Sequence, residues 1–122
     1  MRYALCLVSV AILIGHLGGE TRKTYYDNGK VKQEMSWELD KPEVVVKYYD
    51  ENGKLKQVAN YRNGKQDGVT KYYDENGNLK QESNWKDNKV DGITKEYYEN
   101  GKPKQEVNFI DNKRNGISKG IL

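Results

Sequence analysis

Apolar and polar residues alternate along most of the chain after the first 19 residues, which is the pattern of strands with two different faces. Four Asn-Gly steps interrupt this alternation, at Asn28-Gly29, Asn52-Gly53, Asn76-Gly77 and Asn100-Gly101. Asn-Gly between two alternating segments favours a two-residue type I′ turn, because both residues tolerate a positive φ. The pattern therefore predicts a β-hairpin around each step and gives no helical period.

A repeat of 24 residues relates these hairpins to one another. The turn glycines keep this spacing, and so do four bulky aromatic residues: Trp37, Tyr61, Trp85 and Phe109. A second glycine recurs at Gly68, Gly92 and Gly116. Tyrosine pairs precede the turns with a spacing that varies between 23 and 25, at Tyr25-Tyr26, Tyr48-Tyr49, Tyr72-Tyr73 and Tyr97-Tyr98. Tandem units of this length stack on their neighbours to build one array.

Two-residue turns fix the cross-strand register of each unit. In the second unit, Tyr48 is expected opposite Gln57, Tyr49 opposite Lys56, Val46 opposite Ala59, and Lys47 opposite Val58. The same rule aligns three opposite charges: Lys23 with Glu34, Lys71 with Glu82, and Lys95 with Glu106. It also sets Gly68 opposite Trp85 and Gly92 opposite Phe109, where a ring can cover a strand glycine.

We therefore predict an all-β fold, a single-layer antiparallel meander of about four tandem 24-residue β-hairpin repeats with eight or nine strands. Alternation places the four bulky aromatics on one face, together with Val31, Leu55, Leu79 and Pro103, and places the charged residues on the other. The candidate binding residues on the aromatic side are Trp37, Tyr48, Tyr61, Tyr72, Trp85, Tyr98 and Phe109. A single layer has nothing to cover such a stripe, so these rings are either the protein's own thin core or a surface for a partner.

Composition agrees with a thin protein. The 122 residues suffice for one domain, 35% are hydrophobic, 32% are charged, and the mean hydropathy is −1.02. The 21 basic and 18 acidic residues give a net charge of +3 and are interleaved along the chain. This mixture does not favour nucleic-acid binding.

The first residues resemble an export signal. Arg2 precedes an apolar run from Ala4 to Ile14, which is short for a membrane span, and Gly18 and Gly19 follow it. We expect residues 1–19 to be a signal peptide cleaved near positions 18–19, with an uncleaved anchor as the alternative. Residues 20–122 would then form the repeat array, in the periplasm, at the cell envelope or secreted.

The residues used most often in catalysis are missing from the predicted array. Cys6 is the one cysteine and His16 the one histidine, and both lie in the predicted leader. Without them the array has no soft metal ligand and no usual nucleophile or general base. We therefore predict a protein that is not an enzyme and uses no metal or cofactor.

The recurring motif, Tyr-Tyr-x-x-Asn-Gly-Lys-Leu-Lys-Gln-Glu followed by an aromatic and then Asn-Gly-Lys-x-Asp-Gly, resembles the bacterial variant of the MORN repeat (membrane occupation and recognition nexus). The best copies are residues 48–68 and 72–92, and residues 25–44 and 97–116 are altered copies. In the first copy Pro42-Glu43-Val44 replaces the second glycine turn, which suggests a modified cap. Residues 116–122 are expected to form a closing strand.

The resemblance implies β-hairpin arrays that bind proteins or, in some cases, phospholipid, and it offers no catalytic residue to transfer. Bacterial proteins of this kind are often labelled antitoxins. We expect an exported, non-enzymatic protein-binding module, with an antitoxin or immunity role as the narrower hypothesis. The alternatives are glycan or cell-wall binding through the aromatic stripe and binding to a phospholipid surface, the latter disfavoured because Lys23, Lys71 and Lys95 have predicted glutamate partners.

Overall fold

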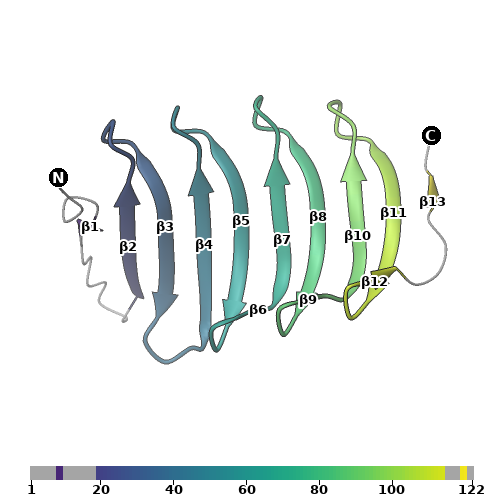
Figure 1. The fold of residues 1–122 in the computed structure, drawn as a ribbon, viewed down its shortest axis with the longest axis horizontal. Helices are drawn as coiled ribbons and strands as arrows, with labels where there is room; N and C mark the ends of the chain where they lie inside the picture. Colours follow the sequence, from purple (N-terminus) through teal and green to yellow (C-terminus); the bar gives the residue numbers. More distant parts are fainter. Residues whose placement is uncertain (1–7, 10–18, 115–118, 121–122) are drawn as a thin grey trace.

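The computed structural model describes residues 8–9, 19–114 and 119–120, and within them the chain is all-β. Thirteen strands form one antiparallel sheet, and no helix occurs among the described residues (Figure 1). The eight long strands follow chain order across it: β2 (Gly19–Tyr25), β3 (Val31–Glu38), β4 (Glu43–Tyr49), β5 (Leu55–Arg62), β7 (Gly68–Tyr73), β8 (Leu79–Lys86), β10 (Gly92–Tyr97) and β11 (Pro103–Ile110). The predicted meander of four hairpin repeats is confirmed.

Five two-residue strands complete the sheet: β1 (Val8–Ser9), β6 (Lys65–Gln66), β9 (Lys89–Val90), β12 (Lys113–Arg114) and β13 (Lys119–Gly120). β6, β9 and β12 pair with the ends of β5, β8 and β11 as short hooks. β13 pairs with β11, which agrees with the expected closing strand, and β1 pairs with β2. Apart from β1 and Gly19, the predicted signal peptide lies outside the described residues, as does Gly116.

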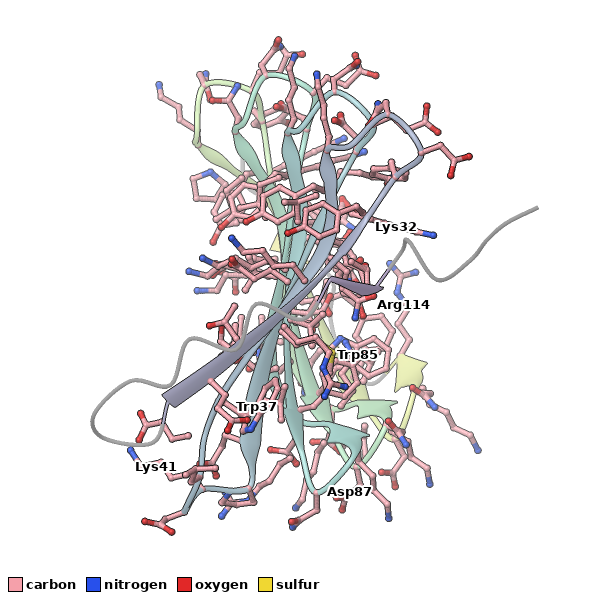
Figure 2. The ribbon with its side chains drawn as sticks, turned by 90° about the vertical axis from the view of Figure 1, so that its left-hand side faces the viewer. Lys32, Trp37, Lys41, Trp85, Asp87 and Arg114 are labelled. Atoms are coloured by element: carbon pink, nitrogen blue, oxygen red, sulfur yellow. The ribbon has the colours of Figure 1, made fainter. Side chains whose placement is uncertain are left out.

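The sheet is one twisted layer with side chains on both sides (Figure 2). Trp85 and Arg114 project to the same side in this view. Because no second layer covers the described strands, each strand presents side chains to solvent on both faces. Any burial must therefore come from side chains covering one another within the layer.

Most of the predicted register is confirmed. Tyr48 pairs with Gln57, Val46 with Ala59 and Lys47 with Val58. The three predicted lysine–glutamate pairs are also in register, in β2–β3, β7–β8 and β10–β11. Gly68 lies opposite Trp85, and Gly92 lies opposite Phe109.

The predicted type I′ geometry at the four repeated Asn-Gly steps is wrong. Only the glycine has a positive φ there, between 84° and 89° in the four turns. Gly53 N donates to Asp50 O (3.0 Å) and Asp50 N donates to Lys54 O (2.8 Å), which is a three-residue loop with glycine at its left-handed position. Asp50 Oδ1 accepts the N–H groups of Asn52 and Lys54, both at 2.9 Å, and so stabilises the longer loop.

Two-residue turns do occur, at the opposite end of the sheet. Both central residues have positive φ at Asn63-Gly64 (50° and 80°), Asp87-Asn88 (48° and 69°) and Asp111-Asn112 (49° and 70°). They join β5 to β6, β8 to β9 and β11 to β12. The same dipeptide, Asn-Gly, therefore adopts two different turns in this chain. In the three-residue loops a side-chain oxygen accepts the N–H after the glycine, from Asp50 and Asp74 in the middle repeats and from Asn28 and Asn100 in the outer ones.

The three-residue loops change which residues share a face. Near the turn Tyr49 pairs with Leu55, not with Lys56 as predicted, and the register shifts between Tyr48 and Tyr49. A β-bulge compensates for the extra loop residue, so the strand register beyond the bulge is the predicted one. Consequently Val31, Leu55, Leu79 and Pro103 pair with Tyr25, Tyr49, Tyr73 and Tyr97 on the charged face, and their predicted place beside the bulky rings is wrong.

Glycine and asparagine together form the junctions between the later repeats. Gly68 and Gly92 have φ of 98° and 106°, where the chain bends from each hook into the next long strand. Asn84 Nδ2 donates to Ile93 O (2.7 Å) across this bend, and Asn60 makes the equivalent bond to Val69 O (2.6 Å). The space over each glycine is closed by this asparagine, and no Trp85 atom lies within 4 Å of a Cβ built at Gly68.

We predict that Gly92→Ala destabilises the fold by about 1–3 kcal/mol, the usual cost of a strained backbone conformation. The residue has a φ of 106°, and an added Cβ would lie 3.2 Å from Asn84 Cβ. Urea denaturation measures the change. An unchanged urea midpoint in Gly92→Ala would contradict the prediction.

Candidate functional site

The four bulky rings lie on one face, called here the ring face and defined by Trp37, Tyr61, Trp85 and Phe109. Trp37 pairs with Val44, which pairs with Tyr61, and antiparallel partners share a face. Gln57 shares the face of Tyr61 and pairs with Tyr72, which in turn pairs with Gln81. Trp85 therefore lies on this face too, because residues an even number of positions apart on one strand share a face. All four rings are half-buried.

A row of small residues beside these rings is the most buried part of the described chain. It consists of Val46, Ala59, Thr70, Ser83, Thr94 and Val107, of which Ala59 and Thr70 are 0% exposed and the others at most 9%. The row lies two residues along the strands from the rings, so larger side chains on both flanks can cover it. The rings therefore form the cover of the protein's own thin core.

Tyr48 and Tyr72 flank the buried row on its other side. Burial, and then the hydroxyl of Tyr61, raise the pKa of Tyr48 from 10.0 to about 12. Burial followed by the proximity of Tyr61 also raises the pKa of Tyr72. The structure thus brings three of the predicted site residues together, and Tyr48 and Tyr61 line a shallow hollow of about 270 Å³ with Met35, Val44 and Val46.

Tyr98 lies apart from the other predicted site residues. It begins the last turn, at the position that Asp50 and Asp74 hold in the middle repeats, and it is 41% exposed. The Lys104 ammonium lies 5.8 Å from the centre of its ring. The structure also explains the varying spacing of the tyrosine pairs. Tyr25, Tyr49, Tyr73 and Tyr97 keep the 24-residue spacing, and the other tyrosine of each pair lies either directly before or directly after it in the sequence.

These four tyrosines form a surface that the sequence analysis missed, called here the tyrosine row. It alternates tyrosine with an aliphatic residue on the charged face, in the order Tyr25, Val31, Tyr49, Leu55, Tyr73, Leu79, Tyr97 and Pro103. Leu55 and Tyr73 line an open hollow of about 470 Å³ with the neighbouring turns. The strict 24-residue spacing was the signal for this row, and the type I′ assignment concealed it.

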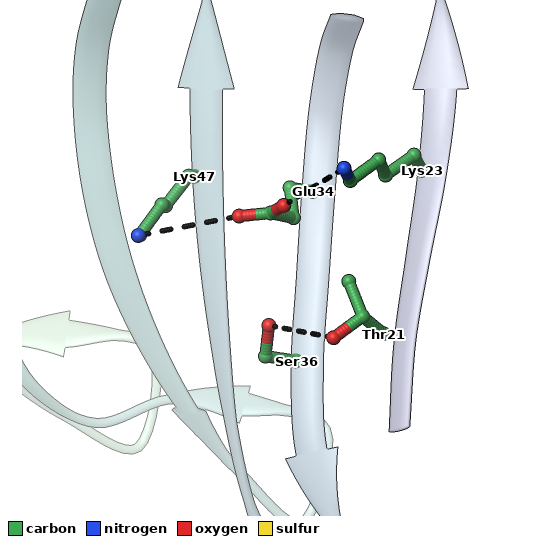
Figure 3. Close-up of polar contacts among 5 residues, drawn as sticks. All are labelled: Thr21, Lys23, Glu34, Ser36 and Lys47. Carbon is green, nitrogen blue, oxygen red and sulfur yellow. Dashed lines mark hydrogen bonds and ion pairs between the residues drawn. The ribbon is translucent and has the colours of Figure 1, made fainter. Parts of the chain in front are cut away.

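A row of charges lies beside the tyrosine row on the same face, called here the charge row. Across the sheet it consists of Lys23, Glu34, Lys47, Val58, Lys71, Glu82, Lys95 and Glu106, each in register with the next. Glu34 lies between two lysines, 3.6 Å from Lys23 Nζ and 4.0 Å from Lys47 Nζ (Figure 3). The other ion pairs among the described residues are Lys41–Glu38 and Arg62–Glu43, so Lys71 and Lys95 belong to none.

Tyrosine hydroxyls of the tyrosine row reach toward carboxylates of the charge row. Tyr97 Oη donates to Glu82 Oε1 at 2.5 Å, and this bond, followed by burial, raises the pKa of Tyr97 to about 12. Burial and then the charge of Glu34 raise the pKa of Tyr49. Tyr73 has the equivalent place beside Val58, where no carboxylate exists.

The described residues show no grouping suited to metal chemistry and no membrane-spanning helix. Among them no three His, Cys, Asp or Glu residues gather so as to hold a metal ion. No helix of the described part is long and apolar enough to cross a membrane. The two faces of the sheet are therefore the candidate functional surfaces.

We predict that Trp85→Phe is tolerated while Trp85→Ala costs about 3 kcal/mol, a typical loss for removing a packed ring. Trp85 Nε1 is buried without a hydrogen-bond acceptor among the described residues, so phenylalanine keeps the cover and removes an unsatisfied donor. Phe109 already holds this position in the next repeat. Thermal and urea unfolding of both variants test this, and equal losses would contradict it.

Alkaline pH should destabilise the fold between pH 10 and 12, where the unfolded chain has lost the protons of Tyr48 and Tyr97 and the folded chain still holds them. A raised folded-state pKa means that the folded chain holds these protons more tightly, so the stabilisation is complete below pH 10 and disappears as the pH approaches 12. Glu82→Gln should lower the pKa of Tyr97 and leave that of Tyr48 unchanged. Phenolate absorbance during a pH titration measures both, and an unaltered Tyr97 in the variant would contradict the assignment.

Comparison with known proteins identifies the repeats. The family model described as MORN repeat variant matches residues 21–38, 42–63, 66–87 and 90–111. No curated protein matches the chain in sequence. The matched segments correspond to the four hairpin units of the sheet.

Solved structures add a likeness of fold. Two crystal structures of TarM superpose with a TM-score of 0.54, at 10% and 11% sequence identity. One of them is a mutant of S. aureus TarM in complex with Fondaparinux, alpha-GlcNAc-glycerol and UDP. The alignment covers 80% of this chain and 19% of each TarM chain, so it shows a shared sheet architecture alone. With four matching segments over more than half of its length, this chain belongs to the MORN repeat variant family.

Proposed function

We propose that this protein is a non-enzymatic protein-binding module whose partner docks on the charged face. Repeats of this family are generally interaction modules and carry no catalytic machinery. The observation that carries the proposal is the tyrosine row, which runs across all eight long strands. Tyrosines present a large, rigid contact area with a polar end, which suits protein recognition.

The two faces differ in what remains for a partner to contact. On the ring face the large rings already cover the most buried residues of the chain. On the charged face, Val69 and Ile93 are exposed at 36% and 42%, and Lys71 and Lys95 lie free of ion pairs with described residues. A mixed surface of tyrosine, aliphatic residues and lysine is typical of an interface with a polar rim.

Export and a role in neutralising a partner are further parts of this proposal. The apolar segment from Ala4 to Ile14 supports export, in which case the partner is met in the periplasm, at the cell envelope or outside the cell. An immunity or antitoxin function is the narrower form, in which the partner is a toxin.

Adjacent tyrosines on opposite faces give a matched test of the docking face. A display library of protein fragments from the producing organism is selected on the immobilised chain, and the affinities of enriched fragments are measured. Tyr73→Ala, on the charged face, should weaken binding about tenfold, as for an interface hot spot, and Tyr72→Ala, on the ring face, should change it about twofold or less. No enrichment over a blank surface would refute the binding function.

The ring face is the second candidate, favoured by the hollow between Tyr48 and Tyr61. Here the bulky rings would contact a protein or stack on a glycan. The same pair of variants decides between the faces, because binding that is lost with Tyr72→Ala and kept with Tyr73→Ala would assign it to the ring face.

A further inference from the structure

One position breaks the alternation of the charge row. Reading across the sheet, glutamates stand between lysines at Glu34 and Glu82, and Glu106 follows Lys95. The corresponding residue of the second repeat is Val58. The row therefore holds four lysines and three glutamates, and its missing carboxylate lies at the centre of the sheet.

The residues around this gap are of the kind that flank a glutamate in the other repeats. Lys47 and Lys71 lie directly opposite Val58 on its two neighbouring strands, as Lys23 and Lys47 do for Glu34. Lys47 reaches back to Glu34 at 4.0 Å, and Lys71 makes no ion pair with a described residue. Two lysines thus flank an apolar position, and each has a glutamate on its other side only: Lys47 pairs with Glu34, and Lys71 lies opposite Glu82.

The tyrosine next to the gap lacks its acceptor as well. Tyr97 donates to Glu82, its diagonal neighbour in the adjacent strand. Tyr73 has the same relation to Val58, so the residue at the corresponding place is apolar and offers its hydroxyl no carboxylate. The ring of Tyr73 also borders the open hollow that it shares with Leu55.

We infer that the gap at Val58, between Lys47 and Lys71, receives a carboxylate side chain from an acidic segment of a protein partner. The carboxylate completes the charge row and accepts from the Tyr73 hydroxyl, and an apolar neighbour of that side chain enters the hollow at Leu55 and Tyr73. The apolar floor and the adjoining hollow favour an acid carried on a protein side chain over a free inorganic anion. This inference rests on the proposed binding function and names the chemistry of its partner.

A substitution at the gap itself gives the sharpest test. Val58→Glu supplies the missing carboxylate from within the chain, so it should weaken binding of the enriched fragments about tenfold or more and leave the midpoint of thermal unfolding close to that of the wild type. Lys71→Gln should weaken binding severalfold. Lys41→Gln is the control, because Lys41 pairs with Glu38 (3.0 Å) in the loop between β3 and β4, away from the charge row, and it should leave the affinity unchanged.

The fragments provide the complementary test. Enriched fragments should carry Asp or Glu next to an apolar residue, and exchanging that acid for its amide should weaken binding to the wild-type chain but not to Val58→Glu. Fragments that bind Val58→Glu as tightly as the wild type, while remaining sensitive to Tyr73→Ala, would overturn this inference and leave the proposed function standing. Absence of any enriched fragment would overturn both.

Discussion

The fold depends on one constraint, that a single-layer sheet can bury only what its own side chains cover. The most buried of the described residues are small and lie in one row, between flanking rows of larger side chains. They are Val46, Ala59, Thr70, Ser83, Thr94 and Val107. A large residue in that row would lift the rings, and a small residue in the ring positions would leave the row in water. This explains why a chain with 35% hydrophobic residues can form an ordered sheet at all.

Because each repeat buries little by itself, the contacts between repeats must be specific. The second residue of each later two-residue turn makes such a contact: Asn112 Oδ1 accepts from Val90 N (2.7 Å) while Asn112 N donates to Val90 O (2.8 Å). Asn88 makes the same pair with Gln66. In the second repeat the residue is Gly64, which has no side chain to make the pair, and the turn contacts the preceding loop through one backbone bond, Asn63 N to Pro42 O (3.2 Å). The regular pairing of β3 with β4 holds that first junction instead.

The two faces differ in what they contribute. The ring face supplies the burial, and the charged face combines a continuous tyrosine row with a charge row that is complete around Glu34 and incomplete at Val58. Exposed ion pairs contribute little to stability, so the charge row has little influence on whether the chain folds. In the proposed binding function the same charges select the partner, since unpaired lysines favour acidic surfaces.

Periodicity and alternation in the sequence were sufficient to determine the all-β class, the four repeats, the pairing of Tyr48 with Gln57 and of Lys71 with Glu82, and the common face of Trp37, Tyr61, Trp85 and Phe109. These follow from local rules that repeat every 24 residues. Only the tertiary structure decided the turn type, a three-residue loop in which a side-chain oxygen of Asp50, Asp74, Asn28 or Asn100 accepts the N–H after the turn glycine. That one-residue difference in loop length moves Leu55 and its equivalents to the charged face and creates the tyrosine row. The dipeptide Asn-Gly does not specify the loop length, because it occurs in both turn types.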